Sequence, residues 1–209
     1  KGPTIVDELP LLQPMAPRKF QKLAQRKSVI VLDIRNYGAF GGQHVPGAYH
    51  IDFGGNFATF GGWVLPPGKD ILIVANSPEQ AKEASIWLRR VGLDKAIGFL
   101  EGGMFAWAKE GFPTGHVPQI SAEELRKIAT RGDGLTLVDV RTVGEYEANH
   151  IKGAVNIAAP DLRAQAGTLN KKLPVVLVCS TGHRSSLAAS LLKQKGFKEV
   201  WNVAGGMTG

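Results

Sequence analysis

The chain has 209 residues, of which 44% are hydrophobic, and it carries a formal net charge of +7. This length and composition allow one or two globular domains, and no apolar run reaches the ~18 residues that a membrane span requires. The positive charge is spread along the chain without a basic cluster, so we expect neither a nucleic-acid partner nor a membrane partner, and only a mild attraction for small anions.

The chain begins KGPTIVDELP, without an initiator methionine or a signal-like apolar stretch. We therefore expect it to be a piece of a longer protein. The residues from Thr4 to Pro14 predict an extended lead-in that is punctuated by prolines. Residues 17–25 then predict an amphipathic helix.

Two short apolar runs of the first half, at residues 29–34 and 71–75, predict strands that are buried on both faces. Residues 81–91 predict a helix that stops at Gly92, because glycine is favoured just after a helix C-terminus. Residues 111–119, GFPTGHVPQ, are rich in glycine and proline and predict a linker.

The second half predicts the same order of elements. A helix over residues 121–129 starts with a capping box made by Ser121 and Glu124. Two buried strands and a further helix follow, at residues 135–140, 175–179 and 185–195, and Gly196 ends the last of them. This alternation of strands and helices predicts an α/β protein with a mainly parallel sheet flanked by helices.

The two halves are copies of one unit. VIVLDIRNYGAFGGQHVPGAYHI aligns with LTLVDVRTVGEYEANHIKGAVNI at an offset of 106 residues. DILIVANSPEQAKEASIWLRRVGL then aligns with PVVLVCSTGHRSSLAASLLKQKGF at an offset of 104, and FLEGGM aligns with NVAGGM at 103. Such small changes of offset are changes of loop length between copies of one domain. The sequence therefore predicts two domains, over residues 1–113 and 114–209.

Cys179, the single cysteine of the chain, ends a predicted buried strand. One cysteine forms no internal disulfide, which is typical of a reducing compartment, so we expect a cytoplasmic protein. The loop STGHR separates Cys179 from the predicted helix at Ser185. This loop must turn over the carboxyl end of the strand, where α/β proteins bind their ligands.

The loop combines features that favour a thiolate and a bound anion. The backbone N–H groups of a short turn form an anion-binding nest, and the next helix adds the positive charge of its N-terminus. Gly182 permits unusual backbone angles, and Arg184 adds a cation with a planar set of donors. The alternative is that Cys179 is a small core residue, as a lone cysteine often is. The pattern C-x-x-G-x-R at a strand-to-helix junction favours the reactive thiol.

Four motifs of the second half resemble the rhodanese family of sulfurtransferases in their order and spacing: Asp139-x-Arg141, the turn HIKGAVNI, the loop CSTGHR and the late AGGM. The resemblance covers nearly the whole chain, as two tandem rhodanese-like domains, and implies a five-stranded parallel sheet in each. It implies that Cys179 and Arg184 are catalytic. It also implies that an anionic substrate binds the loop residues Ser180, Thr181, Gly182, His183 and Ser185.

The stretch NFATFGGWVLP and the lead-in resemble one subgroup of this family. In that subgroup, two rhodanese domains follow a metallo-β-lactamase-fold domain, often a persulfide dioxygenase. The resemblance implies an upstream domain of that fold in the full-length chain. Its metal-binding pattern H-x-H-x-D-H does not occur in the 209 residues, and we assign no metal ligands.

The first copy has lost the residues of the cysteine loop. Ala75 stands at the position of Cys179, and Gln80 stands at that of Arg184. Glu79 adds a negative charge there, and Pro78 removes one N–H group. We expect the first domain to be catalytically inactive and to serve in packing, docking or orientation, with binding of a neutral ligand as the alternative.

Asp33 and Arg35 keep the pattern of Asp139 and Arg141 in the copy that has no thiol. This favours a structural role of the pair near the site over a role in steering the substrate. The same reasoning applies to His44 and its equivalent His150. His183 has no such counterpart, and we expect it to face solvent at the rim of the loop, with a role in acceptor access as the alternative.

The predicted reaction is a ping-pong transfer of sulfur. Cys179 takes a sulfane sulfur from thiosulfate or a low-molecular-weight persulfide and passes it to a thiol, sulfite or cyanide, without any cofactor. One alternative is a sulfur carrier or regulatory module that does not turn over. A second is a cysteine phosphatase or arsenate reductase, although the phosphatase loop C-x5-R is one residue longer than C-x4-R here, and arsenate reduction calls for further thiols. The sequence leaves the oligomeric state open.

The two copies end differently. After GGM the first copy continues with FAWAKEGFP, which predicts a closing helix, whereas the second stops at GGMTG. We therefore expect the second domain to lack its last helix.

Overall fold

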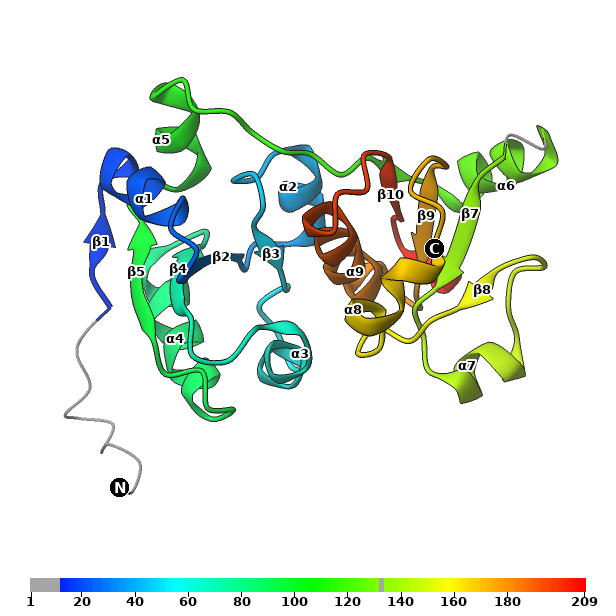
Figure 1. Cartoon of the computed structure of the whole chain (residues 1–209), viewed down its shortest axis with the longest axis horizontal. Coiled ribbons are helices and arrows are strands. Elements are labelled where there is room, and N and C mark those ends of the chain that lie inside the picture. The colour runs from blue at the N-terminus through cyan, green and yellow to red at the C-terminus, as the bar shows by residue number, and fades with distance from the viewer. Residues whose placement is uncertain (1–11, 132–133) are drawn as a thin grey trace.

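Each half of the chain folds around its own parallel sheet (Figure 1). The structure is a computed structural model and describes residues 12–131 and 134–209, so most of the predicted lead-in lies outside it. Both sheets have five strands, in the orders β1-β5-β4-β2-β3 and β6-β10-β9-β7-β8. All pairings between these described strands are parallel. The predicted α/β class with two five-stranded parallel sheets is confirmed.

The first domain is built from five strands that alternate with five described helices. In chain order these are β1 (Pro14–Met15), α1 (Pro17–Ala24), β2 (Val29–Asp33), α2 (Tyr37–Gly42), β3 (Tyr49–His50), α3 (Phe57–Val64), β4 (Asp70–Val74), α4 (Pro78–Arg89), β5 (Ala96–Leu100) and α5 (Gly103–Lys109).

The second domain repeats this order, with the short helices α8 and η2 directly after its third strand. Its elements are β6 (Gln119–Ile120), α6 (Ala122–Arg131), β7 (Thr136–Asp139), α7 (Val143–Ala148), β8 (Val155–Asn156), α8 (Leu162–Gln165), η2 (Ala166–Thr168), β9 (Val175–Val178), α9 (His183–Gln194), β10 (Val200–Val203) and η3 (Gly206–Thr208). The short 3₁₀ turn η3 occupies the place that α5 takes in the first domain.

The central strands β4 and β9 are apolar, except for Asp70 at the start of β4, because helices cover both faces of each sheet. All four residues of β9 are buried, as are the last four of β4. The strands predicted at residues 71–75 and 175–179 are confirmed, each shifted by one residue or less at its ends. In the described ranges, no helix combines the length and the apolar character needed to cross a lipid bilayer.

The long helices α4 and α9 begin earlier than predicted. α4 begins at Pro78 rather than Ala81, because the Ser77 hydroxyl accepts a hydrogen bond from the backbone N–H of Gln80 and proline suits the first turn. α9 begins at His183 rather than Ser185. Gly182 precedes it with a φ of 93°, so the chain turns into the helix directly after the loop.

Other predicted helix ends are confirmed. Gly92 and Gly196 follow α4 and α9 with φ values of 77° and 86°, which is the left-handed conformation of a glycine that ends a helix. Ser121 and Glu124 form the predicted capping box. The Glu124 carboxylate accepts from the N–H of Ser121 at 2.7 Å, and the Ser121 hydroxyl accepts from the N–H of Glu124 at 3.1 Å.

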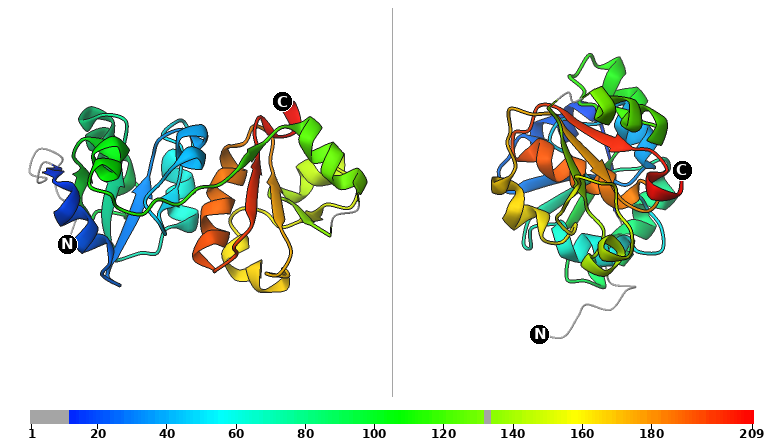
Figure 2. Two further views of the ribbon diagram at one scale, coloured as in Figure 1. Left: turned by 90° about the horizontal axis from the view of Figure 1, so that it is seen from above. Right: turned by 90° about the vertical axis from the view of Figure 1, so that its right-hand side faces the viewer.

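α9, which follows the cysteine loop, lies between the two sheets (Figures 1 and 2). It packs against β9 and β10 of its own domain and against β3 of the first domain. Every residue from Ser185 to Leu192 is buried, as expected of a helix that is enclosed on all sides. The core is therefore continuous through both domains.

His44 and His150 occupy the same turn in the two copies, as the repeat predicted. Each ring donates from Nδ1 to the carbonyl four residues earlier, at 2.8 Å in His44 and 2.9 Å in His150. His44 is buried and stacks on Phe40, whereas His150 is exposed. Burial lowers the pKa of His44 from 6.5 to about 4, and the hydrogen bond to the Phe40 carbonyl opposes this only in part.

We expect His44 to make the first domain sensitive to acid. Its folded-state pKa lies below its unfolded value, so between pH 6.5 and about 4 the unfolded chain binds the extra proton and stability falls as the pH falls. The full shift corresponds to at most about 3 kcal/mol. Urea unfolding followed by tryptophan fluorescence should show this loss, because three of the four tryptophans lie in the first domain.

The control pair for this prediction is His44→Gln and His150→Gln. His44→Gln should flatten the dependence of stability on pH in that window, whereas the exposed equivalent should leave it unchanged. Equal pH dependence in wild type and His44→Gln would contradict the prediction.

Candidate active site

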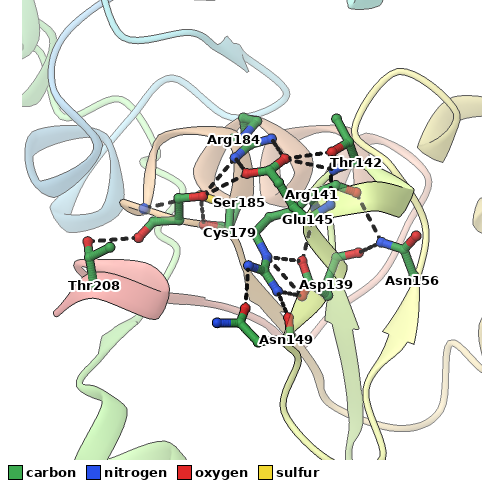
Figure 3. Close-up of polar contacts among 12 residues, drawn as sticks. Asp139, Arg141, Thr142, Glu145, Asn149, Asn156, Cys179, Arg184, Ser185 and Thr208 are labelled. Carbon is green, nitrogen blue, oxygen red and sulfur yellow. Dashed lines mark hydrogen bonds and ion pairs between the residues drawn. The ribbon is translucent and has the colours of Figure 1, made fainter. Parts of the chain in front are cut away.

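The sulfur of Cys179 lies at the carboxyl end of β9, and its residue is only 1% exposed. The backbone N–H of Gly182 donates to Sγ at 3.1 Å, and the hydroxyl of Ser185 donates to it at 3.3 Å (Figure 3). Among the described residues, the sulfur accepts a backbone hydrogen bond from Gly182 alone, so the predicted nest of several N–H groups around it is not seen. Both donors stabilise negative charge on the sulfur.

The loop between β9 and α9 is short because α9 begins at His183. Gly182 has a positive φ that lets the chain turn from the loop into α9, and a Cβ there would lie 3.2 Å from the ring of Tyr37 in the first domain. Ser180 is half-buried, and Thr181 is exposed. The predicted loop residues therefore fall into two groups. Gly182 and Ser185 contact the sulfur, whereas Thr181 and His183 line a pocket between the domains.

Arg184 pairs with Glu145 of α7 rather than pointing to the sulfur (Figure 3). Both guanidinium Nη atoms donate to the carboxylate at 2.7 Å, and Nη2 also donates to the Ser180 hydroxyl at 2.9 Å. This pairing holds the pKa of Glu145 well below its usual range and raises the pKa of Arg184. Arg184 therefore stays charged and fixes the side of the loop.

Residues near the end of the chain hydrogen-bond to the backbone of the cysteine loop. The N–H groups of Met207 and Thr208 donate to the carbonyls of Cys179 and Ser180, at 2.8 and 3.1 Å. The Thr208 hydroxyl donates to the Ser180 carbonyl as well. Gly206 lies so close that a Cβ on it would stand 2.2 Å from the carbonyl oxygen of Cys179. The late GGM motif thus holds the backbone of the loop.

Asp139 and Arg141 lie beside the site as a buried ion pair with a distance of 2.7 Å. Arg141 also donates to the Asn149 carbonyl at 2.6 Å, and the Asn156 amide donates to the carbonyls of Asp139 and Arg141. Asp33 and Arg35 repeat the pair in the first domain at 2.6 Å. These bonds join β7 to the following turn, which is the arrangement that a structural role requires.

In the equivalent loop of the first domain, the side chain of Gln80 hydrogen-bonds to the loop backbone. Ala75 takes the place of Cys179, and the N–H of Asn76 donates to the side-chain oxygen of Gln80 at 2.8 Å. One loop N–H is thus occupied by the residue that replaces Arg184.

The first domain contributes to the rim of the cysteine loop. His183 Nδ1 lies 2.8 Å from the carboxylate of Asp52, and its ring meets the Tyr37 ring edge-on with centroids 5.2 Å apart. A pocket of about 650 Å³ lies between the domains and is lined by Thr181, His183, Arg184 and Asp52 with aromatic residues of the first domain, which are Phe53, Phe57, Phe60 and Trp63.

The predicted site residues did not include Glu145, Asp52 or Thr208. A signal for Glu145 existed, because the equivalent position of the first copy is Ala39. Glu145 and Arg184 are therefore replaced together where Cys179 is replaced. For Asp52 the corresponding signal is Ala158 in the second copy.

Fold and site together define an α/β protein that holds a single buried thiol under donors at the carboxyl end of a parallel sheet. The chain belongs to the rhodanese-like domain family, whose family model matches residues 16–110 and 121–209. Both copies are matched, including the one without cysteine.

Two curated relatives match over about the length of one domain. The "Putative sulfur carrier protein YrkF" of Bacillus subtilis is 37% identical over 91 residues, which are 44% of this chain and 49% of that protein. The "Thiosulfate sulfurtransferase GlpE" of Coxiella burnetii is 33% identical over 88 residues, which are 42% of this chain and 81% of that protein. The chain thus spans about half the length of the first of these relatives.

Solved structures include the "Crystal Structure of Thiosulfate sulfurtransferase from Pseudomonas aeruginosa", with 17% identity and a TM-score of 0.41, which covers 94% of this chain and 41% of that one. A rhodanese-like domain protein from Staphylococcus aureus covers 44% of this chain and 92% of that one, with 28% identity and a TM-score of 0.42. The family assignment rests on the sequence match.

Proposed function

We propose that the chain is a sulfurtransferase that carries a sulfane sulfur as a persulfide on Cys179, with thiosulfate or a low-molecular-weight persulfide as donor. The observation that carries this proposal is the pair of donors on the Cys179 sulfur, the Gly182 N–H and the Ser185 hydroxyl. The first domain has no thiol, and we propose that it is catalytically inactive.

The reaction has two steps that exchange one sulfur atom. The Cys179 thiolate attacks the outer sulfur of thiosulfate, the S–S bond of thiosulfate breaks, and sulfite leaves with the bonding electrons. The enzyme then holds Cys179–S–S⁻, whose charge the loop donors stabilise. An acceptor such as cyanide attacks the outer sulfur, the Cys179 thiolate leaves, and thiocyanate forms. Atoms and charge balance in both steps, so the mechanism needs no cofactor.

In this mechanism Arg184 is a positioning residue. Its guanidinium is bound to Glu145 and Ser180, so it fixes the loop and adds positive potential without touching the sulfur. The same pairing disfavours a phosphatase, because a phosphate dianion would have to compete with Glu145 for that guanidinium.

A sulfur carrier is the second candidate, and the name of the Bacillus subtilis relative favours it. A carrier would form the same persulfide but would release its sulfur only to a protein partner. The finer resemblance to fusions with a metallo-β-lactamase-fold domain stays a proposal, and the comparisons give no support for such a fusion. The cytoplasmic location also stays a prediction.

Mass spectrometry of the intact chain after exposure to thiosulfate tests the proposal. We expect a gain of about 32 Da, one sulfur atom, that peptide mapping places on Cys179. Cyanide should remove this mass and release thiocyanate over many turnovers. A single discharge without turnover would favour the carrier, and a chain that gains no sulfur would overturn both candidates.

A further inference from the structure

We propose that Asp52 of the first domain and His183 of the second form a catalytic pair, in which His183 takes the proton of a thiol acceptor. This inference rests on the proposed sulfur transfer and names its acceptor class, a small organic thiol. Asp52 is the positioning residue and His183 is the general base.

His183 stands at the point where the cysteine loop becomes α9. It follows Gly182 directly, whose N–H is bound to the Cys179 sulfur, and its side chain is 48% exposed. Its Nδ1 lies 2.8 Å from Oδ2 of Asp52, a residue 131 positions away whose side chain is only 12% exposed. A half-exposed ring is thus held in one orientation by a mostly buried carboxylate.

The partner decides which ring nitrogen is free. A carboxylate only accepts hydrogen bonds, so the neutral imidazole carries its proton on Nδ1 and presents the lone pair of Nε2. Within the described residues, no hydrogen bond from a protein group reaches His183 Nε2.

Asp52 is itself fixed by its own domain. Its Oδ2 accepts the N–H of Tyr37 at 3.2 Å, and its Oδ1 lies 3.0 Å from His50 Nε2. That nitrogen donates to the Arg35 carbonyl at 2.9 Å, and His50 Nδ1 accepts the hydroxyl of Ser186 in α9. The groups that face His183 are therefore Asp52 and Tyr37, with Arg184 next to it in the chain and His50 behind Asp52.

Each member of the pair occurs in one copy alone. At the position of His183 the first domain has Glu79, and at the position of Asp52 the second domain has Ala158. The pair therefore exists only across the domain interface, beside the one loop that has a thiol. A packing contact common to the repeat would be expected in both copies.

The pocket beside the pair suits an organic acceptor. Its volume of about 650 Å³ is in the range of small-molecule sites. His183 and Asp52 line this pocket together with aromatic side chains. These side chains would cover the carbon skeleton of an organic thiol, whereas cyanide is too small to contact several of them at once.

The step that His183 assists is the discharge of the persulfide. Cys179–S–S⁻ and R–SH give Cys179–S⁻, R–S–S⁻ and one proton, which His183 Nε2 takes from the acceptor. The new S–S bond forms as the old one breaks, and the electron pair of the old bond stays on Cys179. Sulfite needs no such base, because it already reacts as an anion.

The experiment loads the full chain with sulfur from thiosulfate, removes excess donor, and measures the discharge rate with a small thiol and with sulfite. The variants are His183→Asn, whose amide can still contact Asp52, and Asp52→Asn, with His116→Asn as the control on the exposed linker. At pH 7, His183→Asn should slow discharge by the thiol about 100-fold, at the lower end of general-base catalysis. Asp52→Asn should slow it less, and both should slow discharge by sulfite far less than discharge by the thiol.

The defect should also shrink as the pH rises, because the acceptor thiol then ionises without help. Equal slowing with thiol and sulfite, or a thiol defect that persists in alkaline solution, would show a structural role and overturn the inference. A wild-type chain that takes up no sulfur at all would overturn the proposed function, and this inference with it.

Discussion

Replacing Cys179 with serine is expected to lower the thiosulfate:cyanide transfer rate by at least about 1,000-fold and to abolish the gain of one sulfur atom. A serine hydroxyl does not ionise near neutral pH and forms no persulfide. The fold should survive, because serine is slightly smaller and its oxygen can accept the Gly182 N–H and the Ser185 hydroxyl that now bind the sulfur. Sulfur uptake by mass spectrometry and thiocyanate release check this result.

The matched control places the thiol in the other copy. The double variant Ala75→Cys, Cys179→Ser should stay inactive, because the Gln80 side chain occupies the Asn76 N–H of that loop and Glu79 adds a negative charge. Sulfur transfer by Cys179→Ser at the wild-type rate would contradict the proposal that Cys179 carries the sulfur. Transfer by the double variant would show that the loop surroundings matter less than the thiol itself.

Gly206→Ala is expected to lower sulfur transfer by at least about 100-fold while the rest of the fold persists. The added Cβ would stand 2.2 Å from the Cys179 carbonyl oxygen and 2.6 Å from the carbonyl carbon of Ser180, so the loop must move by close to 1 Å. The positive φ of 61° adds strain for any residue with a Cβ. The loop amide would then no longer point at the sulfur. Transfer rate and persulfide yield measure the effect.

Gly103→Ala is the matched control, because Gly103 is the equivalent residue of the first domain. Its φ is 57°, so the backbone strain is similar, but the nearest atom to an added Cβ is the Ala75 carbonyl oxygen at an ordinary 3.6 Å. This variant should lose stability by about 1–3 kcal/mol and keep most of its transfer activity. If both variants lose activity equally, strain rather than contact with the loop explains the result.

Most of the fold could be predicted from the sequence because its signals are local. The apolar runs before Cys179 and Ala75 are long enough to identify buried strands, and Gly92 and Gly196 mark helix ends by their own backbone preference. The internal repeat then predicted that both halves of the chain form the same kind of sheet. Helix starts were less predictable. The start of α9 depends on the left-handed turn at Gly182, and a glycine in a loop does not by itself show that its φ is positive.

The site was predictable only as far as it lies in one stretch of chain. Cys179 and its loop could be identified from their spacing, and Gly182 and Ser185 do contact the sulfur. The partner of Arg184 lies 39 residues away on α7, and the partner of His183 lies 131 residues away in the other domain. Side-chain pairs at such separations follow from tertiary packing. The sequence therefore predicted a positive charge at Arg184 but not the ion pair of its guanidinium with Glu145.

Because α9 is buried between the domains, losing the thiol of the first copy and losing that whole copy have different consequences for the fold. Losing a thiol at position 75 leaves the packing of the molecule intact, since alanine fits a small site near a strand end. Losing the whole first copy would expose to water the side of α9 that now rests on β3, including the hydroxyls of Ser186 and Ser190 that bond to His50. A domain without a thiol can therefore still contribute to the stability of its neighbour, because it covers one side of the helix that follows the cysteine loop.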